Sequence, residues 1–220
     1  MKTILRKIMF FVIFYLVYFN ALFLIFARTI YSNFLIIFPI IIYFIFIAID
    51  TLLRPLTEKK DRDKSSLLVL LLHILNPICL ILGYYENKWI ISIYIGFYDN
   101  LIVWTMGLII LILGGIILVI SRFQLGKFGS GKLVIEDEHK LIQEGIYIYI
   151  RHPMYSGGIV VFIGFTLIFR CLITIPIYLI LYIIIMIHRI NIEEKILIEE
   201  FGSAYEEYKK SSYRLIPFIY

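Results

Sequence analysis

Long apolar runs constrain the fold of this chain more than any other feature. We place six of them, at about residues 8–27, 33–53, 66–84, 100–120, 154–170 and 172–188. A run of about 18 or more apolar residues can cross the hydrocarbon core of a bilayer as one helix. Lipid offers no partners to backbone polar groups, which favours helices over open strands. The sequence therefore predicts an all-α, polytopic membrane helix bundle of about six spans.

The composition of the chain supports a membrane location. Hydrophobic residues make up 61% of the 220 positions and charged residues only 17%, and a soluble domain cannot hide so much apolar surface. We therefore interpret the net charge of +5 as a topology signal and expect no nucleic-acid partner. Cys79 and Cys171 lie in separate apolar runs and predict packing residues, with neither a disulfide nor a metal site.

Lysine and arginine are distributed unevenly between the two sets of loops. With the N-terminus inside, only Arg28, Lys88 and Arg170 of the 21 basic residues fall in outer segments. Basic residues concentrate in the cytoplasmic loops of membrane proteins. The distribution therefore predicts that both termini are cytoplasmic.

The pattern changes at residue 121, where the long apolar runs give way to polar sequence. We expect residues 1–120 to anchor the chain and residues 121–220 to carry its function. Segment 121–138, with its glycines and its acidic run, predicts a flexible cytoplasmic connector. His73 and Asn76 interrupt the third apolar run, and we interpret them as structural residues.

The densest polar chemistry follows this connector. Pro153 suits the first turn of a helix, which places Arg151 and His152 at the helix start. Free backbone N–H groups there can hold an anion such as a carboxylate. Gly157 and Gly158 would let another backbone or a ligand approach closely.

The last two apolar runs are joined by little more than Arg170-Cys171, which predicts a tight antiparallel hairpin. Such a hairpin returns Arg189 to the level of His152. Arg189 and Glu193 are four residues apart and share a helix face. A surface ion pair would explain this spacing, but we favour a shared site beside His152. An amphipathic helix is expected next, with one face formed by Leu197, Phe201, Tyr205 and Tyr208.

Several of these residues also form an ordered set of short motifs. The set comprises His139, Leu141, Gly145 and Tyr147, then Arg151-His152-Pro153-Met154-Tyr155-Ser156-Gly157, then Glu193-Glu194, and finally Phe201-Gly202 with Tyr205 and Tyr208. In this order and at these separations it resembles the isoprenylcysteine carboxyl methyltransferase family, and more loosely the phospholipid N-methyltransferases. The resemblance covers roughly residues 121–217.

The resemblance implies an S-adenosylmethionine-dependent methyltransferase with its cofactor site at the cytosolic membrane face. It makes Arg189, Glu193 and Arg151 the expected catalytic residues, and assigns Arg189 to the substrate carboxylate. Lys132 stands where the family has a further glutamine contact, so that role is not transferred. The implied cofactor contacts are His139, Lys140, Leu141, Ile142, Tyr147, His152, Pro153, Met154, Tyr155 and Glu193.

The charge of Arg189 bears on the methyl acceptor. A carboxylate, with a pKa near about 3.5, is already ionised at neutral pH and needs no general base. An amine acceptor would first have to lose a proton, and Arg189 would repel its ammonium form. We therefore favour O-methylation of a lipophilic carboxylate, such as a prenylated cysteine, in a protein surrounded by membrane lipids. The alternatives are a phospholipid or small-lipid N-methyltransferase, and a non-enzymatic scaffold with a decayed site.

Overall fold

Helices form nearly all of the regular backbone in the computed structural model, which describes residues 2–57, 59, 61, 63, 65–86, 88–89, 101–130 and 132–217. Within these ranges there is no strand, and an isolated parallel bridge joins Ile150 to Tyr213. The helices are α1 (Lys2–Phe11), the π-helix η1 (Val12–Tyr18), α2 (Phe19–Phe26), η2 (Arg28–Ser32), α3 (Phe34–Leu53), α4 (Ser65–Glu86), α6 (Leu101–Leu125), η4 (Gly126–Phe128), η5 (Gly145–Ile148), α7 (Pro153–Phe169), α8 (Thr174–Phe201) and α9 (Ser203–Ser211).

The predicted all-α membrane bundle is confirmed. Five described helices are long and apolar enough to cross a bilayer, and they are Leu5–Phe26, Phe34–Leu53, Ser65–Glu86, Leu101–Phe128 and Thr174–Phe201. The remaining predicted span is α7, an apolar helix of 17 residues, about 25 Å long at 1.5 Å per residue. The chain is thus an integral membrane protein, while six crossings and cytoplasmic termini stay predictions. The loop cations Lys60, Arg62 and Lys64 lie outside the described residues.

One helix prediction is wrong at the C-terminal end of the chain. The last apolar run and the expected amphipathic helix are not separate, because α8 continues without a break from Thr174 to Phe201. Gly202 then turns the chain with a φ of 52°, a conformation that glycine adopts at little cost. Tyr205 and Tyr208 therefore lie on α9, while Leu197 and Phe201 end α8.

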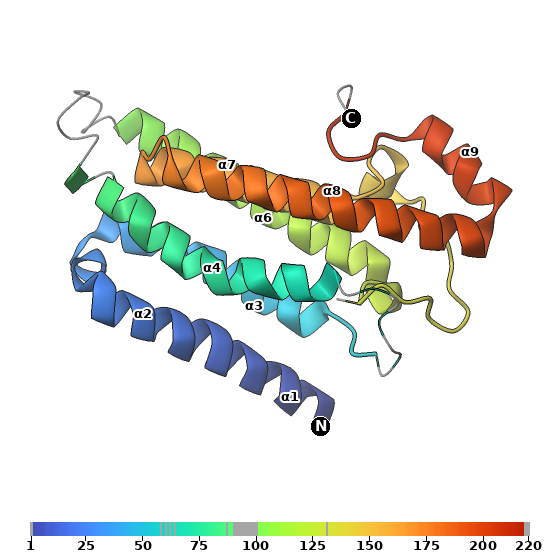
Figure 1. Cartoon of the computed structure of the whole chain (residues 1–220), viewed down its shortest axis with the longest axis horizontal. Coiled ribbons are helices and arrows are strands. Elements are labelled where there is room, and N and C mark those ends of the chain that lie inside the picture. Colours follow the sequence, from blue (N-terminus) through green and yellow to red (C-terminus); the bar gives the residue numbers. More distant parts are fainter. Residues whose placement is uncertain are drawn as a thin grey trace.

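The long helices run side by side along the longest axis of the molecule (Figure 1). The start of α1 lies at the same end of this bundle as α9 and the segment between α6 and α7. The functional region is therefore built where the membrane helices end.

The contact between α6 and α7 is the closest in the bundle, because glycines on both helices face the partner. A Cβ added to Gly114 would lie 2.8 Å from the Gly157 carbonyl oxygen, and one added to Gly164 would lie 2.8 Å from that of Gly107. Such distances leave no room for a side chain. Small residues allow close backbone packing, which holds helices together in lipid where the hydrophobic effect does not. The predicted role of Gly157 in close approach is confirmed.

The α7–α8 hairpin also agrees with the sequence, and its connection is capped by an acidic side chain. Arg170 adopts a left-handed conformation with a φ of 51°. The buried Glu86 carboxylate at the end of α4 accepts hydrogen bonds of 2.7–2.9 Å from the backbone N–H groups of Leu172, Ile173 and Thr174. A negative charge at a helix N-terminus also interacts favourably with the helix dipole. Glu86 thus fixes the start of α8.

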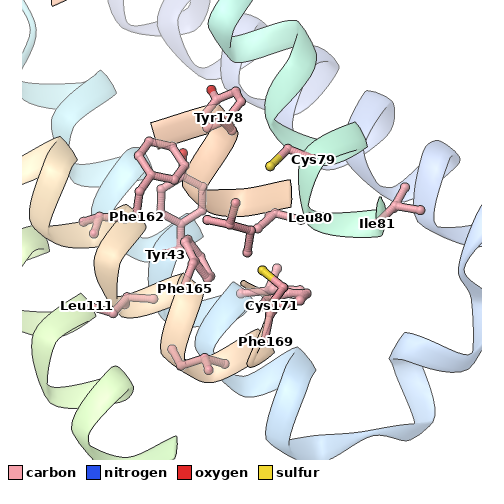
Figure 2. Packing of buried hydrophobic residues seen from close by; sticks show 14 of the residues in the cluster. Tyr43, Cys79, Leu80, Ile81, Leu111, Phe162, Phe165, Phe169, Cys171 and Tyr178 are labelled. Atoms are coloured by element: carbon pink, nitrogen blue, oxygen red, sulfur yellow. The ribbon is translucent and has the colours of Figure 1, made fainter. Parts of the chain in front are cut away.

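Aromatic and aliphatic side chains fill the space between α3, α4, α7 and α8. Tyr43, Phe162, Phe165 and Tyr178 gather there (Figure 2). Cys79 and Cys171 belong to the same cluster as buried free thiols, as the sequence predicted. This packing holds α7 and α8 in place within the bundle.

Candidate active site

A cavity of about 130 Å³ opens at the end of the bundle where α6, α7 and α8 meet the segment from Leu125 to Tyr147. Eleven of the twelve predicted site residues line it. The exception is Pro153, which is buried at the first position of α7. The eleven are His139, Lys140, Leu141, Ile142, Tyr147, Arg151, His152, Met154, Tyr155, Arg189 and Glu193.

The start of α7 is held by a buried carboxylate. Glu194 accepts from Arg151 Nε at 2.9 Å, lies 3.3 Å from His152 Nε2, and forms an ion pair with Arg214 at 3.1 Å. Of the paired glutamates, Glu194 is therefore a structural hub, whereas Glu193 faces the cavity.

The sequence predicted that free backbone N–H groups at this helix start could hold an anion, but those of Arg151 and His152 are not free. These groups donate to the carbonyls of Tyr213 and Arg214 at 2.8 and 3.2 Å. The helix start instead fixes the C-terminal segment of the chain beside the cavity. The side chain of Arg151, an expected catalytic residue, lines the cavity, and it also donates to the carbonyl of Ser212.

Tyr155 links the two residues that were predicted to share a site. Its hydroxyl donates to Glu193 Oε2 at 2.8 Å and accepts from Arg189 Nε at 3.0 Å. Arg189 also donates from Nη1 to the hydroxyls of Ser65 and Ser66, at 3.1 and 3.3 Å. Arg189 is only 4% exposed, so these bonds hold its guanidinium at a fixed place in the cavity wall.

His139 lines the same cavity and lies close to two aromatic rings. Its ring centroid is 4.6 Å from that of Phe128 and 5.7 Å from that of Phe201. Its Nδ1 accepts from the backbone N–H of Glu136 at 3.2 Å, which requires an unprotonated Nδ1. Burial lowers the pKa of His139, and the nearby carboxylates of Glu136, Glu200 and Glu193 oppose this shift. His139 is therefore a neutral, aromatic wall residue at neutral pH.

Segment 121–138 is a wall of the cavity, so its prediction as a flexible connector is wrong. Leu133 and Val134 are 5% and 8% exposed. The segment is held by the Leu133 N–H, which donates to Asp61 Oδ1 at 2.9 Å, and by Arg122, which donates to the Gly129 carbonyl. The apolar side chains of this segment pack against the site because a polar contact with Asp61 and one within the segment fix its backbone.

A second cavity, of about 180 Å³, lies deeper among the membrane helices. Its walls are mainly aromatic and aliphatic and come mostly from η1, α2, α3, α4, α6, α7 and α8. Five residues line both cavities, namely Arg122, Ser130, Met154, Tyr155 and Arg189. A cavity with a mixed polar and apolar lining at the bundle end thus meets a largely apolar cavity within the bundle at Tyr155 and Arg189.

The sequence did not indicate several residues of this junction. Ser65 and Ser66 open α4 and bind Arg189, although they lie in the part of the chain that was expected only to anchor. Lys132, to which no role was transferred, does line the cavity, and its Nζ donates to the carbonyls of Thr57 and Lys59. For Ser65 and Ser66, the sequence offered one signal, which is two adjacent serines directly before a long apolar run.

Comparison with known proteins places this geometry in context. Residues 102–204 match the family model described as phospholipid methyltransferase. A protein from Oryza sativa subsp. indica named "Probable protein-S-isoprenylcysteine O-methyltransferase" is 36% identical over 118 residues, which cover 52% of this chain and 61% of that protein. The protein-S-isoprenylcysteine O-methyltransferase of Saccharomyces cerevisiae is 33% identical over 120 residues, which cover 52% and 48%. This chain thus spans about half to three fifths of these two relatives.

A solved structure shares the fold. The eukaryotic intramembrane Ras methyltransferase (isoprenylcysteine carboxyl methyltransferase) superposes with a TM-score of 0.60 at 21% sequence identity, covering 82% of this chain and 68% of that one. This shared fold agrees with the sequence relatives described above, which confirm the resemblance inferred from the ordered motifs.

Proposed function

We propose that this chain is a membrane-embedded S-adenosylmethionine-dependent methyltransferase that esterifies the carboxylate of a lipophilic acceptor, with a prenylated cysteine as the first acceptor to consider. The observation that carries this proposal is the meeting of the two cavities at Arg189 and Tyr155. One cavity suits a polar cofactor and the other suits an apolar chain. Their junction is where a group would pass from one to the other.

The lining of the first cavity fits S-adenosylmethionine by its chemistry. The carboxylate of Glu193 suits the cationic amino group or the ribose hydroxyls, and the apolar side chains of Leu141, Ile142 and Met154 suit a flat adenine. The neutral ring of His139 adds a polarisable surface. When bound, the cofactor supplies a methyl group attached to a positively charged sulfur.

Arg189 orients the acceptor in this proposal. Its guanidinium can hold a carboxylate by paired hydrogen bonds, and Tyr155 and Ser65 keep it from turning away. A carboxylate needs no proton removed before it attacks. The residues of the site therefore act by alignment, which can supply much of the rate of a displacement reaction. Arg151 acts indirectly in this proposal. It binds Glu194, and Glu194 in turn holds the start of α7.

Cofactor binding is the first property to test. Replacing Glu193 with Gln should weaken S-adenosylhomocysteine binding by more than about 1 kcal/mol, the typical net value of one hydrogen bond. Titration calorimetry on detergent-purified protein would measure this, with exposed Glu206→Gln as the matched control. Unchanged affinity in a folded Glu193→Gln variant would remove Glu193 from the cofactor site.

Methylation of a phospholipid amine is the second candidate, because the matching family model is that of phospholipid methyltransferases. The buried cation at the junction counts against it, since Arg189 would repel an ammonium group. We also propose that both termini face the cytoplasm, as the distribution of basic residues indicates. Reporter fusions at each end would test this orientation.

A further inference from the structure

The second cavity contains a buried polar residue that a hydrocarbon chain would not satisfy. Asn76 is 3% exposed and lines this cavity from α4. The neighbouring hydroxyl of Tyr178, which lines the same cavity, donates to the Leu72 carbonyl at 2.7 Å and so has no proton left for Asn76. Its Oδ1 has no hydrogen-bond partner in the described part of the chain. Buried polar atoms in folded proteins nearly always have a partner, so this exception requires an explanation.

His73 presents a second acceptor on the same side of α4. It lines the cavity three residues before Asn76, and residues at this spacing are neighbours on a helix. Its Nδ1 lies 2.7 Å from the Val69 carbonyl, which can only accept, so Nδ1 carries the proton. In the neutral ring Nε2 is then an acceptor. Pro77 adds to this polarity, because it has no N–H to give to the His73 carbonyl.

The charged residues of the cavity determine which kind of donor group could bind to Asn76 and His73. The Asp50 carboxylate is already bound by Arg54 at 2.5 Å and by Arg122 at 2.6 Å. Together with Arg189, the charged lining carries an excess of positive charge. An ammonium group would be repelled, whereas a neutral hydroxyl would not. A hydroxyl also both donates and accepts, so it satisfies the Asn76 amide in either orientation.

We propose that the acceptor is a lipophilic acid with a hydroxyl group remote from its carboxylate, and that Asn76, supported by His73, binds this hydroxyl. The inference deepens the proposed function, on which it rests: among lipophilic acids it favours one with a remote hydroxyl over the unsubstituted chain of a prenylated cysteine. Ser65, which holds Arg189, lies 11 positions before Asn76 on the same helix, so the two polar ends of the cavity are about 16 Å apart. This separation sets the length of the acceptor.

Matched pairs of acids test this inference. Straight-chain acids with a terminal hydroxyl and unsubstituted acids of equal length would be titrated by calorimetry into the full chain in nanodiscs. The hydroxylated acid should bind about tenfold more tightly at a length near 16 Å, since a hydrogen bond to an otherwise unsatisfied buried group is recovered. The preference should fade for shorter and longer chains. If the hydroxylated and unsubstituted acids bind the wild-type protein with equal affinity at every length, that result by itself overturns the inference.

Variants identify the residue responsible. Asn76→Leu should remove the preference for the hydroxylated acid, while Val69→Ala, a change of apolar lining in the same cavity, should alter both acids equally. A preference that persists in folded Asn76→Leu would overturn the assignment to Asn76. Methyl transfer read in parallel separates the two proposals. Selective binding without any ester formed supports the inference and counts against the proposed function, whereas equal methylation of both acids counts against the inference alone.

Discussion

Removing the hydroxyl of Tyr155 tests the link between the two cavities with the smallest possible change. In Tyr155→Phe, Arg189 loses a hydrogen bond of 3.0 Å and Glu193 loses one of 2.8 Å. A hydrogen bond to a charged group contributes about 1.5–3 kcal/mol. The Glu193 side chain is 31% exposed, so water can replace its lost bond. Arg189 is only 4% exposed, so water cannot replace its lost bond, and this loss determines the size of the effect.

We therefore expect Tyr155→Phe to lose about 1.5–3 kcal/mol of transition-state stabilisation, which is roughly a 10- to 150-fold fall in kcat/KM. The assay is initial-rate methyl transfer to a prenylated cysteine analogue by protein in nanodiscs. Tyr18→Phe is the matched control, because it removes one hydroxyl that donates to the Ile74 carbonyl away from both cavities. A kcat/KM within twofold of wild type in folded Tyr155→Phe would refute this role of the hydroxyl.

Three further changes test other parts of the site and fold. Arg189→Lys should retain S-adenosylhomocysteine affinity but lose at least tenfold in methyl transfer, because an ammonium lacks the planar pair of donors; equal turnover would contradict the carboxylate role. Glu86→Gln should destabilise the protein by about 1–3 kcal/mol, read as a lower Tm, since one of the two accepting oxygens becomes a donor and the buried negative charge is lost; an unchanged Tm would contradict this. The Tm of the protein should fall as the pH drops below about 6.5, because His139 then takes up a proton in the unfolded chain more readily than in the folded one. Its lowered pKa makes protonation cost free energy in the folded site, and that cost is absent at higher pH. His139→Asn keeps an acceptor without a titrating ring and should flatten this profile.

Much of the site was predictable because its residues are close in sequence or joined by a short hairpin. His139 to Tyr155 form one continuous stretch, and the tight connection at Arg170 determines where α8 returns. The spacing of Arg189 and Glu193 then follows from helix geometry. Local patterns of this kind can be recognised in a single chain.

The remaining features depend on contacts that no local pattern encodes. Ser65 binds Arg189 across 124 positions, and no spacing rule relates residues so far apart. Segment 121–138 has the composition of a connector, but Asp61 and Arg122 fix it as a cavity wall. The end of α8 was misjudged because hydrophobicity stops before the helix does, and a charged helix continues into water as readily as an apolar one.

Formation of a methyl ester is the most direct test of the proposed reaction. Purified protein would be incubated with S-adenosylmethionine labelled on its methyl group, together with a prenylated cysteine analogue or a matched phospholipid amine. Esters release their methyl group as volatile methanol in base, whereas methylated amines keep it. We predict base-labile label with the carboxylate acceptor and none with the amine. Base-stable label with the amine lipid, or no transfer to the carboxylate, would contradict the proposed function.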